Sequence, residues 1–247
     1  MPSLSAVIIT FNEEKNIARC IHSLKDIADE VVVVDSFSTD NTVEICRQHG
    51  AKVIQRKWDD YSSAKNFGNR QAAHDWIFSI DADEAVSEEL KKSILLIKGK
   101  GGNYQFNRLT NYCGKWIRHC GWYPDRKHRL FDRNLWQWEG TIHEKLKSNS
   151  NSFVSLLKGD LLHYSYESIE QHERQTEKFT DLSAAELFSR GIHPAIIKQY
   201  VSPVIKFFHC YFLKLGFLDG YYGFIICRIS AASNFLKYKK LRTLYRK

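Results

Sequence analysis

The sequence predicts an α/β protein with a mostly parallel β-sheet flanked by helices, followed by a helical C-terminal extension. Over the first half of the chain, short apolar segments alternate with segments of helical periodicity, an order typical of parallel sheets with right-handed crossovers. Hydrophobic residues make up 43% of the 247 residues and charged residues 26%, the balance of a globular protein. We expect an α/β domain over residues 1–165 and a helical region over residues 166–247.

Four strands are expected in the first half, because four short apolar runs each end in polar residues. Apolar residues recur every three or four positions between these runs, which indicates helices. Asn12 is expected to open the first helix, Gly50 to end the second and Ser87 to begin the fourth. The predicted strands are 4–10, 30–35, 52–55 and 76–80, and two further helices are predicted at 43–49 and 62–74.

The middle of the chain is rich in aromatic, histidine and arginine residues and is less regular. Short strands are expected at 104–109, 129–131 and 161–164. Ser168 and Gln171 have the spacing of a capping box, which predicts that a helix begins there and runs to about Arg190.

The last part of the chain combines apolar segments with basic residues. The region 194–236 is apolar, but charged residues interrupt it before any run reaches the roughly 18–20 residues that span a bilayer. Its helices could therefore pack as ordinary core or lie in a membrane interface. The final eleven residues contain six basic residues and no acid, a composition suited to anionic headgroups.

Charge and cysteine content narrow the cellular setting. Thirty-six lysines and arginines against 28 acidic residues give a formal charge of +8, which favours an anionic partner such as nucleic acid, a membrane surface or a phosphorylated ligand. The six cysteines form no Cys-x-x-Cys pair, and the chain opens on a strand-like segment rather than a secretory signal. We therefore expect reduced thiols and a cytoplasmic location.

Carboxylates follow three of the predicted strands: Glu13, Asp35, Asp40, Asp81 and Asp83. Ligands of parallel α/β sheets bind beyond the carboxyl ends of the strands, so these side chains are expected to share one edge. Asp81 and Asp83 would face the same way if the chain stayed extended through Ala82, and they would repel unless a cation lay between them. Oxygen ligands suit Mg²⁺ or Mn²⁺, although the same acids could simply precede the helix near Ser87.

The segment "WEGTIHEKL" contains a second set of candidates. Glu139 and Glu144 are candidate general bases, and His143 is a candidate metal or phosphate contact. The spacing is not His-Glu-x-x-His, which argues against a metalloprotease, and a surface loop with two acids would give the same pattern. Basic residues could hold phosphate oxygens or be solvated surface charges: Lys65, Arg70, Arg126, Lys127 and Arg129.

Four stretches together resemble a known family. They are "VIITFNEEKNIARCIHSL", "VVVVDSFSTDNT", "SSAKNFGNRQAAHDWIFSIDADE" and "WQWEGTIHEKL", and in this order they resemble the family 2 glycosyltransferases of the Rossmann-like GT-A fold. The resemblance covers about residues 4–146. Within the family, the chain is similar to lipopolysaccharide inner-core β-1,4-glucosyltransferases, including its C-terminal "KLGFLDGYYGFIICRISAASNFLKYKKL".

The resemblance implies an inverting transfer of a hexose, glucose from UDP-glucose, onto an inner-core heptose, with Mg²⁺ or Mn²⁺ as cofactor. Glu144 would be the base. Many relatives carry a Glu-Asp pair for the base where this chain has His-Glu, so Glu139 remains the alternative. Asp83, Asp81 and His143 would hold the metal. Trp138 and Arg129 would contact the acceptor. Donor contacts would come from Thr10, Asn12, Glu13, Asp35, Lys65 and Asp81.

The resemblance also implies a glycolipid acceptor, so we expect peripheral contact with an anionic membrane at the cytoplasmic face of the inner membrane. Two other hypotheses remain open. A basic, non-enzymatic nucleic-acid-binding protein is disfavoured because acids crowd the expected ligand edge, so no nucleic-acid partner is expected. A metal-dependent nucleotidyltransferase would use similar metal geometry but release pyrophosphate.

Overall fold

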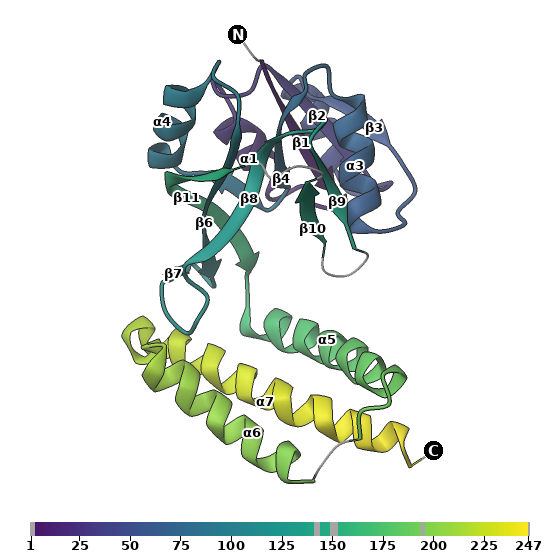
Figure 1. Cartoon of the computed structure of the whole chain (residues 1–247), viewed down its shortest axis with the longest axis vertical. Helices are drawn as coiled ribbons and strands as arrows, with labels where there is room; N and C mark the ends of the chain where they lie inside the picture. Colours follow the sequence, from purple (N-terminus) through teal and green to yellow (C-terminus); the bar gives the residue numbers. More distant parts are fainter. Residues whose placement is uncertain (1–2, 141–143, 149–152, 194–195, 247) are drawn as a thin grey trace. The chain divides into compact units, whose positions relative to one another are not determined.

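The structure, a computed structural model, describes residues 3–140, 144–148, 153–193 and 196–246 (Figure 1). The chain forms two compact units. The first contains Met1–Arg108 and Asp125–Tyr164, and the second contains Leu109–Pro124 and Ser165–Lys247. The predicted division at residue 165 lies at one of these junctions, but segment 109–124, which we expected in the first domain, groups with the second unit.

A mixed sheet lies at the centre of the first unit, with strand order β3-β2-β1-β4-β8-β6-β11-β5. The first four strands are parallel, which confirms the predicted α/β class: β3 (Lys52–Gln55), β2 (Glu30–Asp35), β1 (Leu4–Thr10) and β4 (Trp76–Asp81). Antiparallel pairings join β8 to β4 and β6, and β5 to β11. These strands are β8 (Asp125–Asp132), β6 (Asn103–Tyr112), β11 (Val154–Tyr166) and β5 (Glu84–Val86).

Four helices connect the strands of this unit: α1 (Ile17–Ser23), α2 (Thr42–Gln48), α3 (Tyr61–Gln71) and α4 (Glu88–Ile97). Ser87 caps α4 as predicted, since its hydroxyl accepts a hydrogen bond from the Leu90 N–H. The prediction that Asn12 opens α1 is wrong. Asn12 has a φ of 54°, which asparagine tolerates well, and it bonds to Ser38 and Thr39 of the next loop instead.

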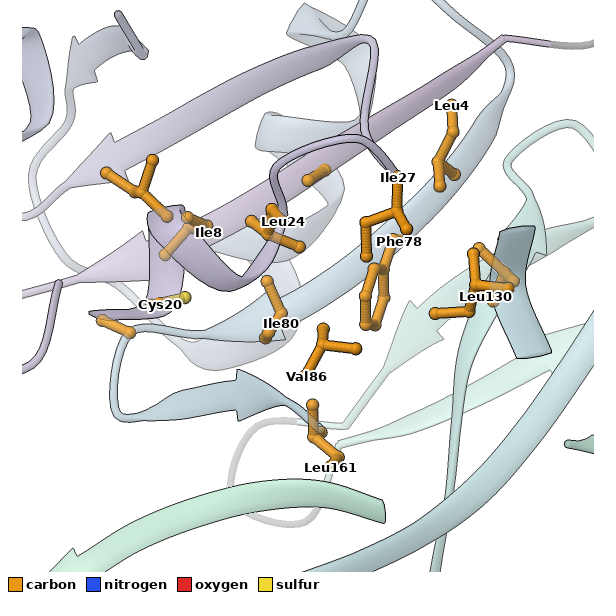
Figure 2. Packing of buried hydrophobic residues seen from close by; sticks show 14 of the residues in the cluster. Leu4, Ile8, Cys20, Leu24, Ile27, Phe78, Ile80, Val86, Leu130 and Leu161 are labelled. Carbon is orange, nitrogen blue, oxygen red and sulfur yellow. The ribbon is translucent and has the colours of Figure 1, made fainter. Parts of the chain in front are cut away.

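The two faces of the sheet are covered by different elements. Alternate residues of β1 point to opposite faces, so Leu4 and Ile8 pack with α1 and α4 in the main core (Figure 2). On the other face Val7 lies under α3, and a Cβ on Gly68 would come within 2.5 Å of it. The absence of a side chain at Gly68 lets α3 approach β1 closely, and this places the neighbouring Lys65 over the end of the sheet.

A two-stranded hairpin contributes further residues to this second face. It consists of β9 (Trp136–Glu139) and β10 (Lys145–Ser148). The Asn66 side chain on α3 donates to the Trp138 carbonyl and accepts from the Trp138 N–H, at 2.8 and 3.0 Å. These two bonds join β9 to α3 directly.

The second unit is mainly helical. It contains α5 (Ile169–Ser189), α6 (Ile196–Phe208), a π-helical turn η1 (His209–Leu213), a 3₁₀ turn η2 (Gly216–Asp219), α7 (Gly220–Leu244) and the short strand β7 (Lys115–Ile117). The Ser168 hydroxyl caps α5 by accepting from the Gln171 N–H, as the capping-box spacing predicts. α7 lies between α5 and α6 (Figure 1).

Within the described part of the chain, no helix taken singly has both the length and the apolar character needed to cross a bilayer. Ile196–Leu213 and Gly216–Leu244 meet those criteria only as a pair, and the two are bent by 71° at the break between them.

His172 makes the second unit sensitive to acid. It is 7% exposed, its Nδ1 lies 3.0 Å from the Tyr112 hydroxyl, and burial lowers its pKa to about 4. Below pH 6.5 His172 binds a proton in the unfolded chain but not in the folded unit. Stability that is present at neutral pH is therefore lost as the pH falls toward 4.

We therefore expect His172→Gln to flatten the pH dependence of unfolding. The wild type should lose about 3 kcal/mol relative to this variant between pH 7 and pH 4, following 1.36 kcal/mol per pKa unit. Urea denaturation of both proteins across this range measures the difference. Parallel stability curves for the two proteins would contradict it.

Candidate functional site

A cleft lies at the edge of the sheet where the ligand was expected. Its volume is about 820 Å³, within the range of nucleotide- and drug-sized sites, and it opens at the carboxyl ends of β1, β2 and β4. Of the predicted residues, Thr10, Glu13, Asp81 and Asp83 line it.

The backbone between Asp81 and Asp83 is not extended, although the predicted pairing of their side chains required this. β4 ends at Asp81, the chain turns through Ala82 and Asp83, and β5 begins at Glu84. The assumption that the chain stays extended through Ala82 is therefore wrong. Glu84 is a β5 residue that is only 1% exposed, and its carboxylate accepts from the Asp81 N–H at 3.0 Å.

Two buried cations neutralise the Asp81 carboxylate. Lys65 Nζ lies 3.0 Å from Oδ1, and Arg129 Nη2 lies 2.7 Å from Oδ2. Burial by itself would raise the pKa of Asp81, but Arg129 and Lys65 outweigh it and hold that pKa well below its usual range. The repulsion expected between the paired aspartates is thus relieved by side chains of the protein.

The same cations belong to a longer chain of ion pairs behind the cleft. Arg129 also lies 3.9 Å from Glu84, and Arg108 connects Glu84 to Asp125 at 3.4 and 2.8 Å. Burial opposes the charge of Arg129, yet Asp81 and Glu84 raise its pKa above the ordinary value. These pairs join side chains of β4, β5, β6 and β8 beside the site.

Lys65 also connects Asp81 to the candidate base. Its Nζ lies 3.1 Å from Glu144 Oε1, and it is 1% exposed. Trp138 covers it, with the ring centroid 4.7 Å from Nζ, and the same ring lies 5.3 Å from the Arg129 guanidinium. Lys65 therefore holds two carboxylates from distant parts of the sequence in one place.

Replacing Lys65 is expected to destabilise the first unit strongly. Lys65→Met leaves the Glu144 and Asp81 carboxylates with one cation fewer, and breaking a buried pair costs roughly 3–5 kcal/mol. Chemical denaturation measures this loss. Lys98→Met is the matched control, because Lys98 pairs with Asp29 at the surface and should lose far less. Equal losses in both variants would contradict the buried network.

Asp83 has a different partner, which the sequence did not indicate. Its Oδ2 lies 3.1 Å from His163 Nε2, and its carbonyl accepts from the Tyr164 N–H at 2.9 Å. His163 comes from β11, 80 residues further along the chain, and both side chains line the cleft. No alternation or spacing in the sequence brings a lone histidine to this position.

Asp83 and His163 are two cleft residues that could hold a divalent cation, whose other ligands would come from substrate and water. Mg²⁺ is usually held by one or two protein ligands together with substrate phosphates and water. No group of three His, Cys, Asp or Glu side chains within metal-binding reach occurs among the residues that the structure describes. The predicted ligand His143 lies outside those residues.

Two predicted donor contacts instead organise the rim of the cleft. Asp35 is fully buried and accepts hydrogen bonds from Ser38 and, at 3.1 Å, from Gln55. Asn12 accepts from the Thr39 N–H at 2.8 Å. Neither is among the cleft-lining residues, so the structure gives both a role in shaping the loop after β2.

The predicted acceptor contacts also have an unexpected placement. Arg129 and Trp138 are 4% and 6% exposed and pack behind the cleft rather than lining it. Glu139 is exposed and pairs with Lys147 across the β9–β10 hairpin at 2.6 Å, whereas Glu144 points to Lys65. Of the two candidate bases, Glu144 is therefore the one connected to Asp81.

Four exposed aromatic residues around the cleft were not identified as site residues from the sequence. Phe11, Phe37 and Trp58 each follow a parallel strand within three residues, and Tyr61 packs edge-on against Trp58 at 4.7 Å. All four are between 44% and 55% exposed. Their common position after β1, β2 and β3 was a usable signal, because flat apolar rings at the ligand edge can stack on a nucleotide base.

Comparison with known proteins defines the class of this fold and site. Residues 5–151 match the profile of Glycosyl transferase family 2, and the chain belongs to that family. Its GT-A-type fold is the one that the sequence predicts. It is 34% identical to an uncharacterised glycosyltransferase of Rickettsia typhi, with 99% of this chain and 88% of that protein aligned.

A second relative has a more specific description. The lipopolysaccharide core biosynthesis glycosyltransferase LpsC of Rhizobium meliloti is 28% identical, with 96% of this chain and 91% of that protein aligned. Among solved structures, S. aureus TarS 1–349 in complex with UDP-GlcNAc aligns with 99% of this chain and 91% of its own, at 17% identity and a TM-score of 0.47.

Proposed function

We propose that the protein is an inverting glycosyltransferase that transfers glucose from UDP-glucose to a heptose of the lipopolysaccharide inner core. One observation carries the chemistry: Asp83 and His163 line a nucleotide-sized cleft, and a candidate base, Glu144, is held by Lys65 beside the neighbouring aspartate. The similarity to LpsC over nearly the whole chain supports the lipopolysaccharide acceptor.

Each part of the cleft has a defined task in this proposal. Asp83 and His163 would hold Mg²⁺ or Mn²⁺, which supplies positive charge to the diphosphate leaving group. The aromatic rings of Phe11 and Phe37 would stack on the uracil base. Thr10 and Glu13 also line the cleft and would contact the nucleotide.

Glu144 would act as the general base. Its carboxylate removes the proton from the attacking acceptor hydroxyl, whose oxygen then forms the new bond to the anomeric carbon. Lys65 keeps the carboxylate in position through its fixed contact at 3.1 Å. Attack on the side opposite the leaving nucleoside diphosphate converts an α-linked donor into a β-linked product.

The acceptor would be presented at the cytoplasmic face of the inner membrane, with the protein bound peripherally. The formal charge of +8 favours contact with anionic headgroups. This location also gives the enzyme access to both a soluble nucleotide sugar and a lipid-linked sugar.

A donor-hydrolysis screen tests the proposed activity. The purified chain is incubated with a panel of nucleotide sugars, with Mg²⁺, with Mn²⁺ and with EDTA, and nucleoside diphosphate release is measured. We expect UDP release from UDP-glucose that depends on the cation. Pyrophosphate release from a nucleoside triphosphate would instead identify a nucleotidyltransferase, and nucleic-acid binding without any hydrolysis would identify a binding protein.

A further inference from the structure

The second unit exposes a continuous row of apolar side chains on α6 and η1. We call Ile197, Val204, Ile205, Phe208, Phe212 and Leu213 the apolar stripe. All six are exposed, and Leu213, Ile197 and Ile205 are 75%, 72% and 63% exposed. From Val204 onward they recur every three or four residues with adjacent pairs, and Ile197 precedes Val204 by seven residues, about two helical turns, which puts them on one side of the helix. The five stripe residues from Val204 onward, with His209, line a hollow of about 620 Å³.

The apolar stripe faces away from the helices of its own unit. The buried positions of this segment, Gln199 and Cys210, lie roughly on the opposite side of the helix at 100° per residue. Gln199 accepts from Arg242 of α7 at 3.0 Å, which marks the side that packs on α7. An exposed apolar surface of this kind marks a site of interaction with a protein or a membrane.

The charge around the apolar stripe identifies the partner. From Gly191 to Lys247 there are ten lysines and arginines and one acid, Asp219. Asp219 is 4% exposed and accepts from the N–H groups of Arg118 and His119, so it contributes little to the surface. Lys198 and Lys206 of α6 are exposed. Two copies of such a surface would repel each other, whereas an anionic bilayer matches both its charge and its apolar character.

We propose that the apolar stripe inserts into the boundary between headgroups and acyl chains of an anionic bilayer, with α6 lying in the plane of the membrane. Exposed lysines of α6 such as Lys198 contact the headgroup phosphates. This inference rests on the proposed function in one respect, namely that the acceptor sugar is carried by a lipid.

Two of the six basic C-terminal residues, which the sequence suggested as the membrane contact, have partners on neighbouring helices. Lys240 pairs with Asp181 of α5 at 2.7 Å, and Arg242 donates to Gln199 of α6. These side chains hold α7 between its two neighbours. The apolar stripe, and not the terminal basic cluster, is therefore the principal contact in this proposal.

Vesicle flotation with the full chain tests the proposal. Vesicles of phosphatidylcholine alone are compared with vesicles that contain phosphatidylglycerol. The variant Ile197→Ser/Ile205→Ser/Leu213→Ser removes three stripe residues. Leu96→Ser/Phe153→Ser is the control, because Leu96 and Phe153 are 75% and 83% exposed and belong to the first unit. We expect the wild type and the control to bind anionic vesicles and the stripe variant to bind roughly 100-fold more weakly.

Several outcomes would overturn the proposal. They are the absence of wild-type flotation, equal flotation of the stripe variant, and equal binding to vesicles without anionic lipid. A wild-type dimer that the stripe substitutions dissociate, without vesicle binding, would show that the stripe joins two copies instead. UDP-glucose hydrolysis without vesicles is measured in parallel. Its absence in the wild type would count against the proposed function and leave the vesicle result unaffected.

Discussion

Asp83→Asn is expected to lower the turnover number by roughly 100-fold or more and to weaken Mn²⁺ binding at least about tenfold. The substitution keeps the size of the side chain but removes the charge that would hold the cation beside His163, 3.1 Å away. UDP release from UDP-glucose measures turnover. Titration of the purified protein with Mn²⁺ in the presence of UDP, followed by electron paramagnetic resonance, measures binding without relying on activity.

Asp26→Asn provides the matched control for this variant. Asp26 pairs with Lys91 at 3.0 Å, but it lies on the surface away from the cleft residues. Its replacement should change neither turnover nor Mn²⁺ binding. Full activity and unchanged Mn²⁺ affinity in Asp83→Asn would remove Asp83 from the metal site and transfer the role to residues not yet considered.

Glu144→Gln is expected to lower the turnover number by roughly 10²–10⁴-fold while leaving the affinity for the donor nearly unchanged. Glutamine keeps a hydrogen-bonding side chain of the same length but cannot accept the acceptor's proton. Its effect should appear in the transfer step, because the proposed base touches the acceptor hydroxyl and not the nucleotide. Single-turnover transfer and separate UDP-glucose binding measurements distinguish the two quantities.

Glu139→Gln serves as the comparison for the base. Glu139 is 55% exposed at its side chain and already pairs with Lys147, so its loss should reduce transfer little. If Glu139→Gln lost transfer and Glu144→Gln kept it, the assignment of the base would be reversed. Circular dichroism shows whether either variant has unfolded. The proposal is supported if Glu144→Gln is folded but inactive while Glu139→Gln remains active.

The paired aspartates illustrate how unequal two neighbouring carboxylates can be. Asp81 is bound by Lys65 and Arg129, so its negative charge is already balanced inside the protein. Asp83 faces His163, whose imidazole can serve as a neutral ligand. The proposed metal site therefore depends on Asp83 more than on Asp81, and Asp81 connects the site to the buried ion pairs behind it.

Much of the fold could be predicted because its signals are local. The strands 4–10, 30–35 and 52–55 occur with the predicted bounds, since each is a short apolar run with polar ends. Ser87 and Ser168 cap α4 and α5 because a cap depends only on residues within one helical turn. The first helix was placed too early, because the bonds that hold Asn12 come from a loop more than 25 residues away.

The sequence by itself determined the family, the parallel strands and the edge at which the candidate site lies. The tertiary structure alone decided which side chains meet there. The partners of Asp81 and Asp83 come from α3, β8 and β11, and His163 is 80 residues from Asp83. Periodicity records which face of an element is apolar, but ion-pair geometry depends on where distant strands end and on one turn at Ala82, which no local pattern specifies.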